Sequence, residues 1–348
     1  MKAPDQILFS IIVPVYNRPD EVADLLESLE AQTDKGFETV IVEDGSTVPC
    51  LRAGENPDGS LIPEGHDALR LKYFRKDNEG RSIARNYGLD RADGDFFIFV
   101  DSDCILPPYY IESLRRSLKE NPVDCFGGPD AAHDSFSRTQ KAISYSMTAF
   151  LTTGGIRGGK VSMEKFTPRT FNMGFSREVY DRVGGFREMF SEDIDMSTRI
   201  RLAGFSISLY PDVYVYHKRR VDLKKFWKQV HVFGMSRITL ELLYPGSMKL
   251  VHWLPAVFTV GAVALIIGSF FCKWLLIPLL VYVVALWAGA LVATKDLDIA
   301  CRAIAAAMVQ LTGYGTGFLK AWFSKILLGK GRDINEEIEI RKGKNENL

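Results

Sequence analysis

The sequence predicts an α/β fold with a mainly parallel sheet flanked by helices, followed by hydrophobic helices suited to a membrane. Short apolar segments alternate with amphipathic helices through the first two thirds of the chain, a pattern typical of a parallel sheet covered on both faces. The last third contains two apolar runs of about 20 residues, the length that crosses a bilayer as helix. At 348 residues the chain is long enough for one large domain and a smaller appendage.

The sheet is expected to begin with a strand over residues 10–15, which an amphipathic helix over 21–32 follows. Further strands are expected over residues 38–42, 69–74 and 96–100. Residues 52–67 are rich in Gly, Pro, Asp and Asn, which predicts a surface loop insertion. Polar residues gather after the strands, where ligands bind in open α/β sheets.

Composition excludes some partners. The 43 basic and 43 acidic residues give a formal net charge of +0, so the chain lacks the global field that would hold nucleic acid. The five cysteines contain no CxxC pair, and their odd number argues against a disulfide framework and for a reducing compartment. No small-residue cleavage site follows the first apolar run, so a secretory signal is not expected.

The membrane prediction rests on residues 250–271 and 274–294, which carry no charge between their bounds. A helical core of a soluble domain is the alternative interpretation. A third segment, 299–323, contains Arg302, Gln310 and Lys320, so it is expected to span or to lie at the interface. Basic residues cluster before the first span and after the third, which places both flanking parts in the cytoplasm. Three crossings would put the basic tail outside, so two crossings plus an interfacial or re-entrant segment are favoured.

Acidic and basic residues follow the predicted strands. Asp101 and Asp103 come directly after the strand at 96–100, and two such carboxylates can hold a divalent cation that neutralises a diphosphate. Asp44 follows another strand and can accept a hydrogen bond from a nucleobase imide. Arg81 and Arg85 lie near a helix start, where they can meet phosphate oxygens. Taken singly, these residues also fit ordinary acidic turns and solvated surface.

The order of these segments resembles family 2 glycosyltransferases of GT-A fold. The matching segments are S-I-I-V-P-V-Y-N at 10–17, V-E-D-G-S at 42–46, N-E-G-R-S-I-A-R-N-Y-G at 78–88, D-G-D-F-F-I-F-V-D-S-D at 93–103, T-F-N-M-G-F-S-R at 170–177, V-G-G-F at 183–186 and S-E-D-I-D-M-S-T-R-I at 191–200. The resemblance covers roughly residues 8 to 240. It implies an inverting transfer from a nucleoside diphosphate sugar, with UDP preferred over GDP.

The resemblance also implies roles for individual residues. Asp193 would be the general base that deprotonates the acceptor hydroxyl, and the metal, Mg²⁺ or Mn²⁺, would be held by Asp101 and Asp103. His217 is expected to be a third metal ligand or a diphosphate contact, with a purely structural role as the alternative. The residues expected to bind the donor are Pro14, Tyr16, Asp44, Arg81, Arg85, Asp101 and Glu192.

Two further patterns have structural alternatives. Asp195 and Arg199 lie four apart on a predicted helix, so a structural ion pair is expected. Residues 152–160 nearly spell a phosphate-binding P-loop, but the next residue is Val161, which has no hydroxyl for Mg²⁺. A flexible gate over the sugar or a plain surface loop is expected instead.

The resemblance suggests a catalytic domain over residues 1–240, a membrane region over 241–330 and a polar cytoplasmic tail over 331–348. The QxxRW motif of polymer-extruding synthases is absent from residues 227–234, so a single transfer is expected. The expected acceptor is a saccharide, carried on a polyprenyl lipid, in cell-surface polysaccharide or glycan assembly. The basic, aromatic stretch at 218–227 would lie against lipid headgroups. The expected location is the inner membrane, multi-pass, with the catalytic domain facing the cytoplasm. A processive synthase and a non-enzymatic glycan- or nucleotide-binding scaffold are the alternatives.

Overall fold

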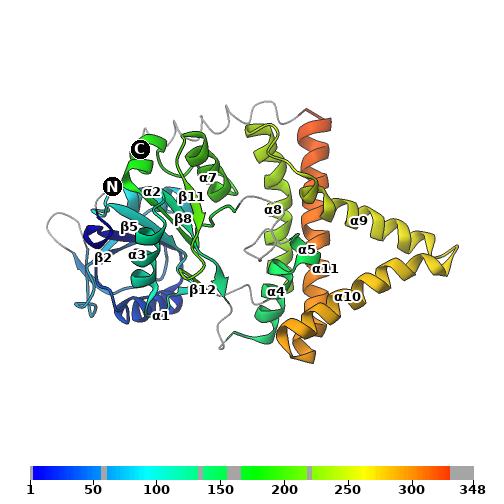
Figure 1. The fold of residues 1–348 in the computed structure, drawn as a ribbon, viewed down its shortest axis with the longest axis horizontal. Helices are drawn as coiled ribbons and strands as arrows, with labels where there is room; N and C mark the ends of the chain where they lie inside the picture. Colours follow the sequence, from blue (N-terminus) through cyan, green and yellow to red (C-terminus); the bar gives the residue numbers. More distant parts are fainter. Residues whose placement is uncertain (1–2, 56–60, 132–135, 155–165, 218–221, 330–348) are drawn as a thin grey trace. The chain divides into compact units, whose positions relative to one another are not determined.

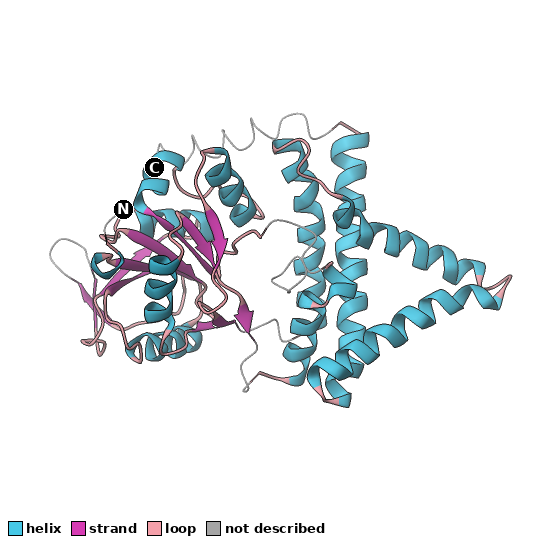
Figure 2. Ribbon diagram, viewed as in Figure 1, coloured by secondary structure: helices cyan, strands magenta, loops and turns pink. Residues whose placement is uncertain are grey.

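The structure is a computed structural model that describes residues 3–55, 61–131, 136–154, 166–217 and 222–329 (Figure 1). The chain forms two compact units. Unit 1 combines Met1–His133 with Thr167–His217, and unit 2 combines Asp134–Phe166 with Lys218–Leu348. Unit 1 contains the sheet, whereas the described part of unit 2 is helical (Figure 2). The expected boundary at residue 240 falls inside helix α8, Leu223–Leu243.

The centre of unit 1 is a parallel sheet, as the sequence predicts. Its four central strands run in the order β6, β1, β2, β5, and each pairs in parallel with its neighbour. Their bounds are Phe9–Val15 for β1, Phe37–Asp44 for β2, Leu71–Lys76 for β5 and Phe96–Val100 for β6. Strands β2 and β6 are buried along their whole length, which explains why β6 is an unbroken apolar run.

The outer strands of the sheet pair in both directions. On one side β10 is antiparallel to both β6 and β8, and β11 is parallel to β8. On the other side β3 and β4 form an antiparallel hairpin beside β5. These strands are β3 Ala53–Glu55, β4 Leu61–Pro63, β8 Cys125–Gly127, β10 Asn172–Ser176 and β11 Ile207–Leu209. The expected loop insertion at 52–67 therefore contains two short strands, with residues 56–60 outside the described part of the chain.

Helices cover both faces of the sheet. On one face Leu25 of α1 and Leu114 of α3 pack with alternate residues of β1, and on the other Ala84 of α2 and Met196 of α7 pack with Ile12 of β1. The helices of unit 1 are α1 Pro19–Glu30, α2 Arg81–Leu89, α3 Tyr110–Glu120, α6 Arg177–Val183 and α7 Glu192–Leu202, with a short 3₁₀ turn at Pro4–Gln6. Because helices cover both faces, the polar residues gather at the edge formed by the carboxyl ends of the strands.

An ion pair holds the turn after α1 against α3. Arg115 Nε donates to Asp34 Oδ2 at 2.7 Å, and the Gly36 N–H donates to Asp34 Oδ1 at 2.7 Å. Burial acts to raise the pKa of Asp34, but the hydrogen bonds from Arg115 and Gly36 outweigh it and leave the pKa below its ordinary value. The folded state therefore prefers the ionised carboxylate.

A second, three-stranded sheet lies beside the carboxyl end of β6. Strand β12, Val215–His217, pairs antiparallel with β7, Cys104–Ile105, and parallel with β9, Asp130–Ala131. In this register His217 is the partner of Cys104. The small sheet therefore brings the residue after Asp103 beside His217, although more than a hundred positions separate them.

Unit 2 is built around two long helices, α8 and α11, Leu297–Ala321. The two helices approach closely at glycines, which have no side chain. A Cβ at Gly234 would lie 2.1 Å from the Tyr314 carbonyl oxygen, and a Cβ at Gly317 would lie 2.0 Å from the His231 carbonyl oxygen. The remaining elements are α4 Arg138–Thr148, α5 Phe150–Thr153, α9 Leu250–Gly268, η2 Lys273–Leu276, α10 Ile277–Thr294 and the π-turn η3 Trp322–Leu327.

Two helical segments of the described chain are long and apolar enough to cross a membrane, Leu250–Gly268 and Lys273–Thr294. They correspond to the two spans expected from the sequence. The third expected segment, 299–323, lies almost entirely in α11, whose glycines and most of whose alanines are buried within unit 2. The tail from residue 330 lies outside the described residues.

Candidate active site

Asp44, the last residue of β2, is buried and holds the loop before α2. Its Oδ1 accepts hydrogen bonds from Lys76 Nζ at 2.9 Å and from the Glu79 N–H at 3.0 Å, and its Oδ2 accepts from the Gly80 N–H at 2.8 Å. A carboxylate has about four acceptor sites, so three donors leave one for an incoming ligand. Sequence reasoning missed Lys76, whose pairing with Asp44 depends on the β2–β5 register.

The loops after β1 and β2 are locked together. Asn17 Oδ1 accepts hydrogen bonds from the N–H groups of Thr47 at 2.9 Å and Val48 at 3.2 Å. Gly45 has φ +71°, and a Cβ there would lie 2.6 Å from the backbone nitrogen of Asn78. Tyr16, next to Asn17, is 52% exposed. Its ring is accessible to a ligand next to the loop that Asp44 begins.

A chain of four charged side chains joins α2, β6 and α7. Arg85 Nη2 lies 2.9 Å from Asp101 Oδ1, and its Nη1 lies 2.9 Å from Glu192 Oε1. Arg81, one turn earlier on α2, pairs with Glu192 Oε2 at 2.8 Å. Arg85 is 1% exposed, and its guanidinium carbon lies 5.7 Å from the centre of the Phe186 ring. The structure thus brings together four of the residues that the sequence predicts to bind the donor.

The field around Arg81 shows that the acidic residues share one environment. Burial acts to lower the pKa of Arg81, but the carboxylates of Glu192, Asp101 and Asp193 raise it above its ordinary value. More than half of the Arg81 side chain is exposed. A permanently charged guanidinium, accessible to solvent, is suited to bind a phosphate group.

Asp193 is the second residue of α7. The Ile194 N–H donates to its Oδ1 at 2.8 Å, and Arg169 Nη1 lies 3.3 Å from its Oδ2. Ser191, which precedes the helix, has φ 65°, a left-handed conformation uncommon for a residue with a side chain. Such strain clusters at functional sites. Arg169 was missed at the sequence level, although it stands just before the T-F-N segment.

Asp195, two residues further along α7, has a structural role. It is fully buried, and its carboxylate pairs with Arg199 Nε at 2.9 Å and Arg187 Nη1 at 3.2 Å. The ion pair predicted between Asp195 and Arg199 is confirmed. Asp195 fastens α7 to the preceding loop and leaves Asp193 as the acidic residue of this helix that is partly exposed.

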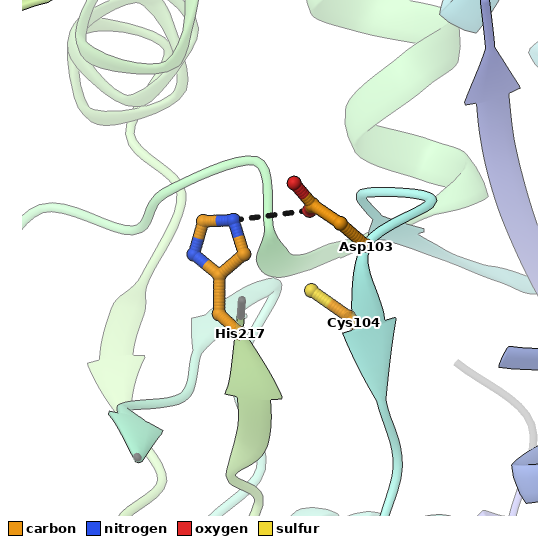
Figure 3. A group of neighbouring side chains, drawn as sticks. All are labelled: Asp103, Cys104 and His217. Carbon is orange, nitrogen blue, oxygen red and sulfur yellow. Dashed lines mark ion pairs between the residues drawn. The ribbon is translucent and has the colours of Figure 1, made fainter. Parts of the chain in front are cut away.

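Asp103, Cys104 and His217 form a group with metal-ligand chemistry (Figure 3). One ligand atom of each lies within 4.8 Å of the others, and Asp103 Oδ1 is 3.2 Å from His217 Nε2. Asp130 Oδ2 lies 3.9 Å from the other ring nitrogen, and the Phe171 ring stacks on the imidazole with centres 4.9 Å apart. Asp130 and Phe171 thus orient a histidine whose Nε2 points at a carboxylate.

The thiol of Cys104 contributes little to such a site. Burial, reinforced by the charges of Asp103, Asp101 and Asp130, raises the pKa of Cys104 well above its ordinary value. Since the thiolate is the form that binds metals, the effective donors are carboxylate and imidazole. A carboxylate and an imidazole are donors that can hold a divalent metal ion.

Some predicted features lie outside the described residues. Helix α5 ends at Thr153, and Gly154 terminates it with φ 63°. The rest of the glycine-rich segment that was expected to form a gate, from residue 155, is not described, nor are residues 218–221 of the basic stretch.

Comparisons with known proteins point to one family of enzymes. The model of glycosyl transferase family 2 matches residues 10–184. An uncharacterized glycosyltransferase of Rickettsia felis is 37% identical over 112 residues, which are 32% of this chain and 17% of that protein. The chain thus spans about a sixth of the length of the first curated relatives it matches. Glycosyltransferase AglE of Haloferax volcanii is 24% identical over 269 residues, covering 71% of this chain and 81% of that protein.

Among solved structures, the chain is similar to the mannosyltransferase PcManGT of Pyrobaculum calidifontis, which was solved with GDP-Man and Mn²⁺. The TM-score is 0.54 at 16% identity, over 91% of this chain and 87% of that one. That likeness shows the GT-A fold. Because the family model spans half of the sequence and includes Asp44, Arg81, Arg85, Asp101 and Asp103, the chain belongs to glycosyl transferase family 2.

Proposed function

We propose that this protein is an inverting glycosyltransferase that moves one sugar from a nucleoside diphosphate sugar to a hydroxyl group of a saccharide acceptor. The observation that carries the proposal is the run of ion pairs from Asp101 through Arg85 to Glu192, next to Asp193. It joins the carboxyl end of β6 to the start of α7. Residues suited to the donor diphosphate and a candidate base are therefore held by one buried arginine.

The donor would bind at the carboxyl edge of the parallel strands. Tyr16 and Pro14 offer an apolar surface to the base, and Asp44 has one acceptor site for a base N–H. Arg81 supplies an exposed positive charge for the diphosphate, while Glu192 holds both arginines in place. The sequence favours UDP, whereas PcManGT was solved with GDP-Man, so a donor screen with both nucleotides decides the base.

The metal would be held by Asp103 and His217, with Asp101 completing the set. Arg85 contacts Oδ1 of Asp101, and the Asp101 side chain is 33% exposed, which leaves Oδ2 for a cation. A divalent cation in this place would stabilise the charge on the leaving diphosphate.

Asp193 is proposed as the general base. As the acceptor oxygen bonds to the anomeric carbon, the bond between that carbon and the diphosphate oxygen breaks on the opposite face, and the hydroxyl proton passes to the carboxylate. Arg169 Nη1 lies 3.3 Å from Oδ2 and orients that carboxylate. An alcohol is a poor nucleophile at neutral pH, so this proton transfer contributes roughly 10²- to 10⁴-fold to the rate.

The test is Asp193→Asn, measured for transfer and for donor binding. Transfer should fall by about 10² or more while donor affinity is retained, because the amide cannot accept the proton. Asp181→Asn, the same change on the exposed surface of α6, is the matched control and should leave both unchanged. Full turnover in Asp193→Asn would assign the base elsewhere.

The proposal extends to the acceptor and to the location of the protein in the cell. We assign residues 1–240 to catalysis, 241–330 to membrane attachment and 331–348 to a cytoplasmic tail, with α9 and α10 entering the inner membrane. Basic residues flank the apolar helices in the sequence, which favours a cytoplasmic active site. A polyprenyl-linked saccharide suits an enzyme tethered to lipid. Product length with labelled donor separates one transfer from processive synthesis, since a ladder of products would contradict a single transfer.

A further inference from the structure

The hairpin of α9, η2 and α10 exposes apolar side chains along its length. In the 18-residue apolar windows of its two segments, only 17% and 11% of residues are buried. The turn between the helices is the most exposed part, with Phe270 at 85%, Phe271 at 90% and Trp274 at 76%. Water-soluble proteins rarely expose an apolar patch beyond a few hundred Å². The surface is therefore suited to lipid hydrocarbon.

The two helices of the hairpin are anchored at different places on α11. Near the start of α9, Ala256 packs with Phe318 in the last turns of α11. Near the end of α10, Ala290 packs with Ala300 in the first turns of α11. The helices therefore leave α11 far apart and converge at their shared turn (Figure 2).

Helix lengths give the reach of the hairpin. The anchor points on α11 are 18 residues apart, or about 27 Å at the rise of an α-helix. With the same rise carried through the residues of the turn, the path from Ala256 to Phe271 is about 22 Å, and that from Ala290 back to Trp274 is about 24 Å. A triangle with these sides places the turn about 19 Å from the line that joins Ala256 and Ala290. The hydrocarbon core of a bilayer is about 30 Å thick, so the turn stops short of the far side.

Charged residues mark the base of this triangle. Lys249 precedes α9 and Lys295 follows α10, and both are exposed. On the first turns of α11, Asp298 pairs with Arg302 at 3.0 Å, and both side chains are at least 38% exposed. These groups favour the headgroup region and resist deeper insertion.

We propose that the hairpin enters the bilayer as a re-entrant wedge, with its base at the headgroups of one leaflet and its aromatic turn just beyond the bilayer midplane. Neither helix crosses, in contrast to the two crossings expected from helix length alone. Lys273 is the charged residue of the turn, and its flexible stem lets the ammonium group extend toward the far headgroups. The inference rests on the membrane attachment proposed above and is independent of the chemistry.

The native Cys272, exposed in the turn, tests the wedge. The Cys301→Ser protein is reconstituted into phosphatidylethanolamine and phosphatidylglycerol liposomes, with a membrane-impermeant maleimide on both sides, and labelling is mapped by mass spectrometry. Cys272 should stay unmodified until detergent is added. In the matched Cys272→Ser protein, the exposed Cys301 of α11 should react in intact liposomes.

If the protein floats with intact liposomes and Cys272 is labelled, the hairpin crosses the bilayer and the wedge is overturned. Protein that does not float would overturn membrane attachment as well, while transfer activity, measured on the same samples, would still report on the proposed function. Depth gives a second readout, with a bimane fluorophore on Cys272. Lipids with bromine near the acyl-chain ends should quench it most, and strongest quenching by headgroup labels would refute the proposal.

Discussion

Replacement of Arg85 should destabilise unit 1 far more than replacement of Arg81, although both arginines pair with Glu192. Arg85→Met keeps most of the side-chain volume but leaves Glu192, which is 2% exposed, without its buried partner and removes the charge beside Asp101. Removal of one member of a buried ion pair costs about 3–5 kcal/mol. Arg81 is 55% exposed as a side chain, so Arg81→Met should cost under about 1 kcal/mol.

The assay must report on unit 1 alone. The five tryptophans, Trp227, Trp253, Trp274, Trp287 and Trp322, all fall in unit 2, so tryptophan emission follows that unit. Hydrogen exchange of the buried β6 amides reports global opening of unit 1. With a factor of ten for each 1.4 kcal/mol, Arg85→Met should speed this exchange by about 140- to 3700-fold, and the tryptophan transition should not move.

A double variant separates lost charge pairing from lost packing. Adding Glu192→Gln to Arg85→Met removes the stranded buried charge, so at least half of the lost protection should return. If the β6 amides exchanged no faster in Arg85→Met than in Arg81→Met, burial of the arginine would not determine the cost of its removal. If the double variant were less protected than Arg85→Met, packing rather than charge would explain the loss.

Three further predictions test other parts of unit 1. Gly45→Ala should weaken donor binding by about tenfold or more, because its φ of +71° and the close Asn78 backbone force the loop to move; Gly54→Ala, which meets nothing within 4 Å, should bind donor normally by calorimetry. Asp34→Asn should lower the melting temperature at pH 7. The difference should shrink as the pH falls below the unfolded pKa near 3.8 and vanish below the lowered folded pKa, since the stability is fully present only above the unfolded value. A difference in melting temperature that persists at acid pH would contradict this role of the Asp34 carboxylate. Mn²⁺ at 100 times its Kd should stabilise the native protein by about 2.7 kcal/mol. The His217→Ala variant should gain no such stabilisation, and equal stabilisation of both proteins would show that His217 is not a metal ligand.

The sequence was sufficient for the four central parallel strands, because each contains a short run of mainly apolar residues. Phe96–Val100 is five apolar residues in a row, and the structure has a strand with those bounds. Strand β2 runs two residues beyond the predicted end, through Glu43 and Asp44. Polar residues extend a buried strand only when partners satisfy them, and here Glu43 accepts from Tyr73 OH and the Cys50 N–H. Such partners are invisible to periodicity.

Membership of a unit was the feature that local pattern did not predict. Helix α4 lies within the first half of the sequence but packs on α11, where Arg138 Nη1 lies 3.2 Å from Asp298 Oδ2. An amphipathic helix shows which face is apolar without identifying the core that receives it. Asp130 was missed for the same reason, since its place near His217 depends on the β9–β12 pairing.

The identity and burial of Arg85 connect the two ends of the proposed reaction. A guanidinium presents its donors in a rigid planar fork, so contacts to Asp101 and Glu192 fix the separation of β6 and α7 in a way that a flexible ammonium group cannot. Glu192 is adjacent to Asp193, and Asp101 is two residues from Asp103, which pairs with His217. The candidate base and the candidate metal ligands are thus positioned by residues that contact one buried side chain. It follows that Arg85→Lys, which keeps the charge but loses the fork, should reduce transfer more than it reduces donor affinity, because positioning errors act on the reacting geometry.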